Sequence, residues 1–207
     1  VEMGKPALVV SALISRSPTL IYFGQEVGEK GSEDLGFGDP SRTSIFDYAG
    51  VPAHQRWMNE GKFDGGQLSR SERALRDYYV KVLNISAYHP AMLGEYQPIA
   101  IAPRYLSAPD EDGMNLGLAY EDANKIVAFI RYSDAGRLLV ISLFSRSETV
   151  DLALPLNSQQ VQALGLSTGL RQVSDMLSGK SYSLEVVEQQ ALLQVTLAPM
   201  QSLVLAL

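Results

Sequence analysis

Apolar residues in the first part of the chain recur at helical spacing in separate segments. The segment KPALVVSALI, residues 5–14, places its apolar side chains on one helical face. A second helical pattern begins near Ser69 or Ser71, either of which suits a helix N-cap, and runs to about Tyr88, before a proline ends it. A shorter helix is expected near residues 52–59.

The apolar run Thr19–Phe23 lies between these helical segments and follows a Ser-Pro break. Such a short, continuous run of strand-forming residues predicts a strand buried on both faces, as in a parallel α/β sheet. Helix, turn and buried strand together indicate the closing half of a β/α unit. Residues 24–69 are rich in Gly, Pro, Ser and Asp, which predicts a long loop after this strand.

After Gly94 the pattern changes to short stretches of alternating apolar and polar residues separated by turn residues. This alternation predicts an antiparallel β-sandwich, with one short helical segment at about residues 158–164. The expected strands are residues 126–132, 138–144, 149–154, 182–187, 191–197 and 202–207.

Composition excludes several classes of function. Hydrophobic residues make up 46% of the 207 residues and charged residues 19%, which is ordinary for a globular protein. The net charge of −6 argues against nucleic acid as a partner, and no basic cluster suggests a membrane surface. The chain has no cysteine, so disulfides and thiolate metal sites are excluded. It begins at Val1 with no signal-peptide pattern, which we interpret as a cut from a larger protein.

Three ordered motifs carry a resemblance to a known family. Pro18–Gly28, PTLIYFGQEVG, resembles the last barrel strand of the α-amylase family of glycoside hydrolases. Residues 75–96, with LRDYY and then HPAMLGEY, are similar to the family's last barrel helix and the start of its C-terminal domain. Residues 126–131 and 139–145 resemble paired strands of its terminal β-sandwich. The motifs keep the family's order and spacing over most of the chain.

This resemblance implies an α+β chain, in which the last β/α unit of a (β/α)8 barrel is followed by an antiparallel β-sandwich. Residues 1–93 would be the C-terminal end of the catalytic barrel and residues 94–207 the sandwich domain. The implied parent is a retaining hydrolase of α-glucans such as starch and maltooligosaccharides. Ser17 and Tyr48 stand where the family often has Gly and Trp, which leaves the substrate, the bond cleaved, and hydrolysis versus transfer open.

The chemistry of such enzymes needs groups that this sequence lacks. Retaining glycosidases use two carboxyl groups ~5 Å apart, one as nucleophile and one as acid/base. The family's Asn-His-Asp signature is absent, and its Arg-x-Asp signature has no plausible strand context here. The resemblance therefore places the catalytic carboxylates upstream of Val1. No catalytic residue is expected in this chain, which we predict to be inactive alone.

Four residues are candidates for substrate binding: Tyr22, Gln25, Glu26 and Arg42. Tyr22 lies in the expected barrel strand and the other three follow it, and loops after strands build the active-site face of a barrel. Three of them have a structural alternative, since Tyr22 could pack in a core, Glu26 could pair with a base, and Arg42 could form a surface salt bridge. Trp57, the single tryptophan, is either a sugar platform or a packed side chain.

No metal or cofactor is expected. His54 and His89 are the only histidines and lie far apart in the sequence, without a dense acidic cluster beside them. The acidic stretch Asp110–Gly113 lacks the full alternation of a calcium loop and is interpreted as a solvated turn.

Two partner hypotheses and one alternative function remain open. One strand with two helices cannot close a barrel, so the chain is expected to pair with the missing barrel portion, to self-associate through residues 1–30, or to fold its helices against the sandwich. The alternative function is a free-standing carbohydrate-binding or interaction module built on the sandwich. A periplasmic or secreted bacterial parent fits a starch-degrading enzyme.

Overall fold

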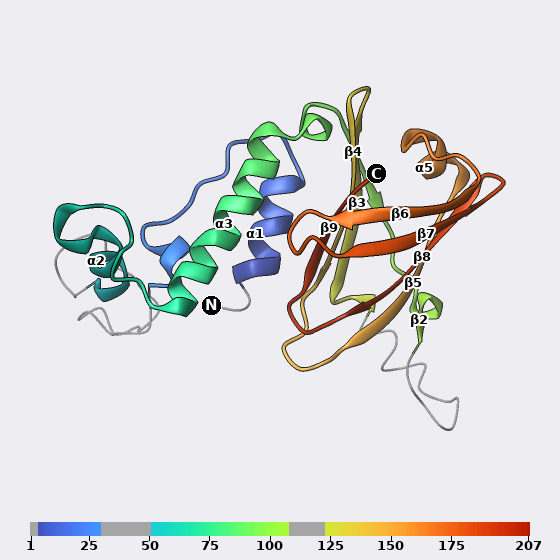
Figure 1. Ribbon diagram of the computed structural model, residues 1–207. Coiled ribbons are helices and arrows are strands. Elements are labelled where there is room, and N and C mark those ends of the chain that lie inside the picture. The colour runs from blue at the N-terminus through green and yellow to red at the C-terminus, as the bar shows by residue number, and fades with distance from the viewer. Residues whose placement is uncertain (1–3, 30–50, 108–122) are drawn as a thin grey trace. The chain divides into compact units, whose positions relative to one another are not determined.

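The computed structural model describes residues 4–29, 51–107 and 123–207 (Figure 1). These residues form two compact units, which are described separately. The larger unit contains the described residues of Val1–Ser17 and Val82–Leu207, and the smaller unit those of Pro18–Lys81. Helix α3 (Arg70–Tyr88) contributes its first turns to the smaller unit and its last turns to the larger one. None of the described helices is long and apolar enough to span a membrane.

The larger unit is built on one antiparallel sheet of nine strands. The strands lie in the order β1-β3-β4-β9-β6-β7-β8-β5-β2, so that the first two strands in sequence form the two edges. Their bounds are β1 Glu95–Ile99, β2 Leu106–Ser107, β3 Ile126–Ser133, β4 Gly136–Leu143, β5 Val150–Leu156, β6 Gly169–Asp175, β7 Ser181–Val187, β8 Gln190–Leu197 and β9 Ser202–Ala206.

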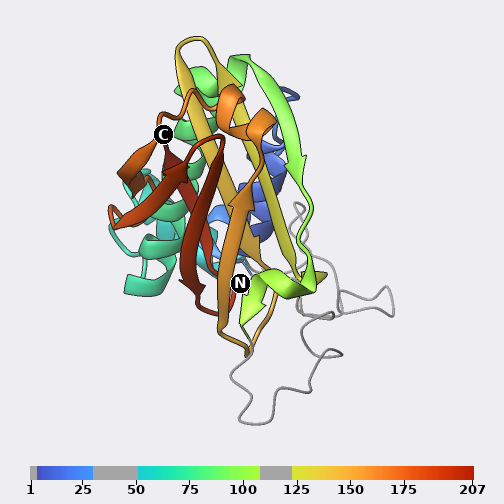
Figure 2. The same ribbon diagram turned by 90° about the vertical axis from the view of Figure 1, so that its right-hand side faces the viewer.

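The sheet curls so that its two halves share one apolar core (Figure 2). Alternation along the strands explains this, since β8 reads exposed and buried at successive positions and turns every second side chain inward. Burial of each large aliphatic side chain contributes roughly 1.5–3 kcal/mol. The core joins residues of β3, β4 and β9 with residues of β5, β7 and β8, among them Ile130, Ile141, Leu205, Leu154, Leu184 and Leu193.

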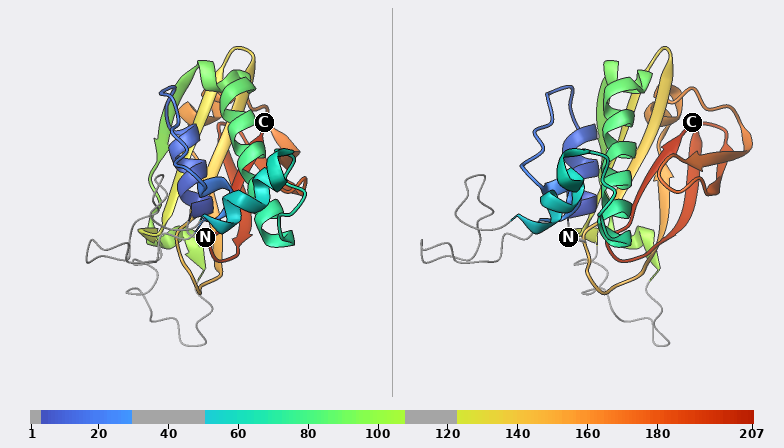
Figure 3. Two further views of the ribbon diagram at one scale, coloured as in Figure 1. Left: turned by 90° about the vertical axis from the view of Figure 1, so that its left-hand side faces the viewer. Right: turned by 60° about the vertical axis from the view of Figure 1, so that its left-hand side comes forward.

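Strands β4 and β9 are buried on their second face as well. Helix α1 (Gly4–Leu13) packs against both strands, and Val140 and Val204 on that face are fully buried (Figure 3). The short helix η3 (Pro90–Leu93) is tied to β3 by Arg131, whose guanidinium donates to the carbonyl oxygens of Met92 and Gly94 at 2.8 and 3.2 Å. Helical segments therefore cover one half of the sheet, while β6–β8 and β5 present a polar face to solvent.

Asp175 joins the two halves of the sheet where their backbone pairing is shortest, between β6 and β9. Strands β6 and β9 pair through only two residue positions, Ser174 with Ala206 and Asp175 with Leu205. The buried Asp175 carboxylate accepts from the N–H of Val204 at 2.9 Å, and from the N–H groups of Leu177 and Ser178 at 3.2 and 3.0 Å. This carboxylate thereby holds the turn after β6 against β9.

The smaller unit consists of short helices around the first turns of α3. They are η1 (Gln25–Val27), α2 (Pro52–Met58) and η2 (Asn59–Gly61). The N-terminus of α3 has a reciprocal cap, in which Ser69 donates its N–H to the Glu72 carboxylate at 2.8 Å and accepts from the Glu72 N–H at 3.3 Å. Val27, Ala53 and Leu68 form a small core.

The sequence predictions of helices at residues 5–14, 52–59 and 69–88 are confirmed by α1, α2 and α3. The six expected strands correspond to β3, β4, β5, β7, β8 and β9, and the expected helical segment is α5 (Ser158–Ala163). Strands β1, β2 and β6 and the turn η4 (Pro103–Tyr105) were not predicted. The sandwich is one curled sheet rather than two separate sheets.

The predicted buried strand Thr19–Phe23 is wrong in this structure. These residues form no strand, and the Leu20 side chain is 88% exposed. A parallel strand needs neighbouring strands to satisfy its backbone groups, and no described residue pairs with this segment. The proposed division between residues 93 and 94 concerns a whole protein and stays a prediction.

Candidate functional site

Three of the four predicted binding residues lie in one turn of the smaller unit. Tyr22 precedes η1, and Gln25 and Glu26 are its first two residues. The turn is closed by hydrogen bonds from the Gln25 N–H to the Tyr22 carbonyl at 3.0 Å and from the Tyr22 N–H to the Gln25 side-chain oxygen at 3.1 Å. Gly24 has a φ of 75°, and a Cβ there would meet Glu29 Cβ at 2.7 Å, so the tight turn requires glycine.

Gln25 is held in place by helix α3. Its amide donates to the hydroxyl of Tyr79 at 3.0 Å. Burial raises the pKa of the Tyr79 hydroxyl, the hydrogen bond from Gln25 lowers it, and the nearby Glu26 carboxylate raises it. Gln25, Glu26 and Tyr79 therefore form one polar group, in which a neutral phenol lies beside an amide and a carboxylate.

Tyr22 is half exposed, with 50% of its side-chain surface open to solvent. The alternative in which Tyr22 packs inside a core is thus wrong for this structure, because the expected buried strand around it does not form. Arg42, the fourth candidate, lies outside the described residues.

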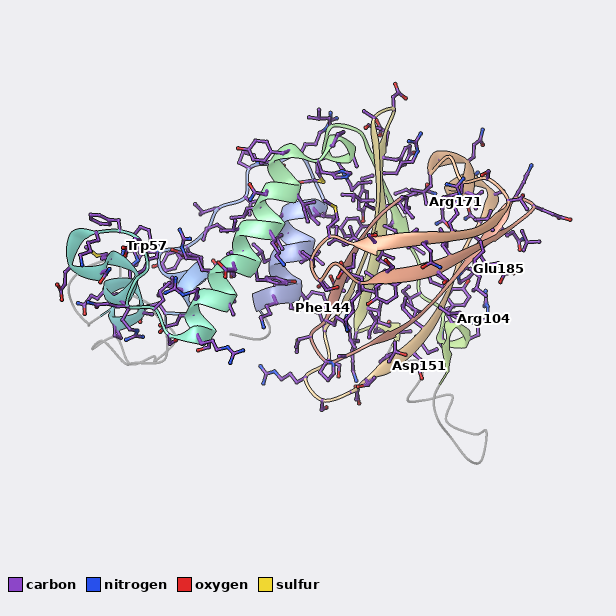
Figure 4. All side chains as sticks on the ribbon, in the orientation of Figure 1. Trp57, Arg104, Phe144, Asp151, Arg171 and Glu185 are labelled. Carbon is purple, nitrogen blue, oxygen red and sulfur yellow. The ribbon has the colours of Figure 1, made fainter. Side chains whose placement is uncertain are left out.

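Two aromatic side chains of α2, His54 and Trp57, contact further rings, and Trp57 is labelled in Figure 4. The ring centroid of His54 lies 4.2 Å from that of Phe23 and 5.5 Å from that of Trp57, and Trp57 in turn lies 5.9 Å from the exposed Phe63. The Arg76 guanidinium stands 5.5 Å from the Trp57 ring centroid. Because Trp57 is partly buried and the Arg76 guanidinium occupies one face of its ring, we interpret it as a packed side chain.

An ion pair fixes α2 against α3. The Arg56 guanidinium donates to both oxygens of Glu72, through Nε at 3.0 Å and through Nη2. Hydrogen bonds from Arg56 and then from Ser69 hold the pKa of the Glu72 carboxyl at about 2, and Glu72 in turn raises the pKa of Arg56. Glu72 is thus a structural anion that is unsuited to proton transfer near neutral pH.

Three carboxylates of the smaller unit have neighbours within it. Glu26 lies near Tyr79, Glu29 accepts the backbone N–H of His54 at 3.0 Å, and Glu72 accepts from Arg56 at 3.0 Å. No cluster of three metal-ligating side chains occurs among residues 4–29, 51–107 and 123–207.

Sequence reasoning missed two of these contacts. Tyr79 was expected only as a helix residue, although the pair Tyr78-Tyr79 on an amphipathic helix could have pointed to a hydroxyl facing the loop. Arg76 was likewise not linked to Trp57, because the two residues come from different helices.

Comparison with solved structures shows which known folds this chain resembles. No protein-family model matches the chain, and no curated protein matches it significantly. The structure of AmyP in complex with maltose matches with a TM-score of 0.57 and 20% sequence identity, over 99% of this chain and 34% of that one. A cyclomaltodextrin glucanotransferase, CldA, matches with a TM-score of 0.58 and 12% identity, over 100% of this chain and 32% of that one. The α-amylase from H. orenii matches with a TM-score of 0.52 and 15% identity, over 99% and 35%.

The chain thus spans about a third of the length of the enzymes it matches. At these identities the matches establish a likeness of fold, and the fold agrees with the family indicated independently by the sequence motifs. The described chain has the fold of one third of an α-amylase-family enzyme, consistent with the C-terminal part.

Proposed function

We propose that this chain is the C-terminal portion of a retaining α-amylase-type glycoside hydrolase that acts on α-glucans. The observation that carries the proposal is the match over 99% of this chain to about a third of AmyP, a structure solved with maltose. A second structure of AmyP holds maltotriose, which supports maltooligosaccharides as the ligand class.

In this proposal the two catalytic carboxylates belong to the part of the enzyme outside these residues. The described carboxylates near the candidate site are held by structural partners or stand singly, as above. Residues 1–93 would complete the catalytic barrel.

Tyr22, Gln25, Glu26 and Arg42 would then contact the glucan. The amide of Gln25 is fixed by Tyr79, so that its position is set before the ligand arrives, which lowers the entropic cost of binding. The half-exposed Tyr22 offers a ring face or a hydroxyl to a sugar. Glu26 would accept from a sugar hydroxyl rather than act as the acid/base.

The free-standing module is less well supported. A sandwich module needs only the sheet, whereas the matched region includes the helices and the turn that precede it. The sheet also places Phe129 fully inside the protein, where it offers no platform to a glucan.

The test compares hydrolysis of starch and maltotriose by this chain and by a chain extended with the catalytic portion. We expect hydrolysis only by the extended chain. In that chain, Gln25→Ala should lower kcat/KM about tenfold, because a positioned hydrogen bond to substrate is lost. Gln67→Ala, an exposed amide of the same unit, is the matched control and should leave kcat/KM unchanged. Hydrolysis by the 207-residue chain alone would refute the proposal.

A further inference from the structure

A pocket lies in the larger unit, which does not contain the candidate site. It has a volume of about 300 Å³ and is lined by residues at the end of β1 and at the end of β5. This volume is at the lower limit of small-molecule sites, roughly 300–1,000 Å³. The lining residues are Ile99, Ala100, Tyr105, Pro155, Leu156, Asn157, Gln160 and Gln190.

The pocket exists because the sheet does not close at this seam. Strand β1 pairs only with β3, and β5 pairs with β8 and, over two residues, with β2. Both strands carry a proline, Pro98 in β1 and Pro155 in β5. Proline has no N–H to donate, so each of these strands offers one backbone donor fewer to a neighbour.

The pocket wall contains a buried amide with unused donors. Gln160 is only 5% exposed, and its side-chain oxygen accepts the N–H of Asn157 at 2.9 Å. The Asn157 side-chain oxygen accepts the N–H of Gln160 at 3.0 Å, which completes the cap of α5. These bonds use both oxygens and orient both amides, but they leave the Nε2 of Gln160 without a partner among the described residues. This amide nitrogen lies at the pocket wall and is available to donate to a ligand oxygen.

The remaining wall combines an aromatic ring with apolar surface. The Tyr105 ring packs on the sheet core. The guanidinium of Arg104, which is labelled in Figure 4, lies 5.0 Å from its centroid and donates to its hydroxyl at 3.3 Å. Because that hydroxyl oxygen accepts from Arg104, its own proton is free to donate to a ligand. None of the lining residues is charged. An uncharged wall with an aromatic ring and three amides suits a ligand with many hydroxyls and no charge.

We propose that this pocket is a second saccharide-binding site, which holds the end of a short α-glucan with the amides of Asn157, Gln160 and Gln190 and the hydroxyl of Tyr105. The choice of an α-glucan rests on the proposed function, whereas the pocket and its neutral, hydroxyl-binding chemistry do not. The site holds a glucan chain on the sheet domain and cleaves no bond.

The test is a titration of the isotope-labelled 207-residue chain with maltotriose, followed by NMR of backbone and side-chain amides. We expect shifts of the side-chain amides of Asn157, Gln160 and Gln190. Gln190→Ala should weaken this binding about five- to tenfold, since it removes one ligand hydrogen bond made by an exposed side chain. Gln159→Ala, an exposed neighbour outside the pocket, should bind as the parent chain does.

Two results would overturn the proposal: no maltotriose-dependent shift at the pocket amides, or shifts there that Gln190→Ala leaves unchanged. Shifts confined to Tyr22, Gln25 and Glu26 would also overturn it, yet they would agree with the proposed function. Hydrolysis by the extended chain is measured separately, so a failure of the pocket is distinguishable from a failure of the glucan assignment.

Discussion

The carboxylate of Asp175 gives the sharpest test of how this sheet is held together. It accepts three backbone N–H groups, from Leu177, Ser178 and Val204, and is 1% exposed. The Asp175→Ala change removes both acceptor oxygens but keeps the backbone pairing with Leu205. The three donors then lose their acceptor, and water cannot readily replace it at the two buried ones, Leu177 and Val204.

The expected loss follows from these contacts. Each buried donor left without a partner costs about 1–3 kcal/mol, so two buried and one half-buried N–H predict a loss of about 3–5 kcal/mol. Asp175→Asn keeps one oxygen and turns an NH2 group toward backbone donors, which predicts an intermediate loss of about 2–3 kcal/mol. Both values are large beside a total stability of about 5–15 kcal/mol for a domain.

The assay is chemical denaturation followed by far-ultraviolet circular dichroism, to which the nine-stranded sheet contributes. Asp151→Ala is the control, because that exposed carboxylate accepts only from Thr196 on the neighbouring strand, and it should cost less than about 0.5 kcal/mol. A stability loss below about 1 kcal/mol for Asp175→Ala, or equal losses for Asp175→Ala and Asp151→Ala, would refute the reasoning that buried donors fix the β6–β9 junction.

Three further predictions concern other parts of the chain. The pKa of the Glu72 carboxyl is held at about 2, below its usual 4.5, so the stability that Glu72 contributes is present above pH 4.5 and is lost as the pH falls toward 2. Glu72→Gln should abolish this acid-dependent loss, which amounts to about 1–2 kcal/mol after solvent screening. The measurement is denaturation followed by the fluorescence of the single tryptophan, which lies in the same unit. The free chain should self-associate through residues 1–30, so Leu20→Asp should shift its mass in analytical ultracentrifugation toward that of a monomer. Leu170→Asp, at a similarly exposed leucine of β6, should leave the mass unchanged. An unsubstituted chain that is monomeric at all concentrations would contradict this prediction. Gly94→Ala would place a Cβ 1.9 Å from a backbone carbonyl oxygen of β3 and should cost more than about 3 kcal/mol of stability, measured by thermal unfolding. Gly179→Ala is the control and should cost about 1 kcal/mol, because its Cβ meets open space and only the φ of 77° is unfavourable. Equal losses in the two variants would show that backbone movement relieves the close approach at Gly94.

Strong periodicity made most of the sheet predictable from the sequence. β3 and β4 carry apolar residues at nearly every position, and β8 alternates without a break. β1 escaped prediction because Pro98 and two polar neighbours interrupt EYQPI, and β6 because Val173 is the single buried apolar residue of GLRQVSD. Edge strands and strands with one weakly apolar face give too little signal, since their pairing is decided by neighbours far along the chain.

The candidate site was predictable in its location but not in its contacts. The motif from Pro18 to Gly28 identified the turn that carries Tyr22, Gln25 and Glu26, yet it also suggested a buried strand that the structure does not form. An apolar run shows that a segment can be buried, and burial itself requires a partner surface. The bond from Gln25 to Tyr79 joins residues 54 positions apart, which no local pattern encodes.

Strand β9 comes last among the described strands but lies in the middle of the sheet, between β4 and β6. As the polypeptide leaves the ribosome, the β3–β4 hairpin therefore exposes an unpaired, apolar edge until Ser202–Ala206 has been translated. Pairing across such a long sequence separation is slow, and an uncovered strand edge is prone to aggregate. We expect this domain to fold after its synthesis rather than during it, and to depend on chaperones that shield the waiting hairpin.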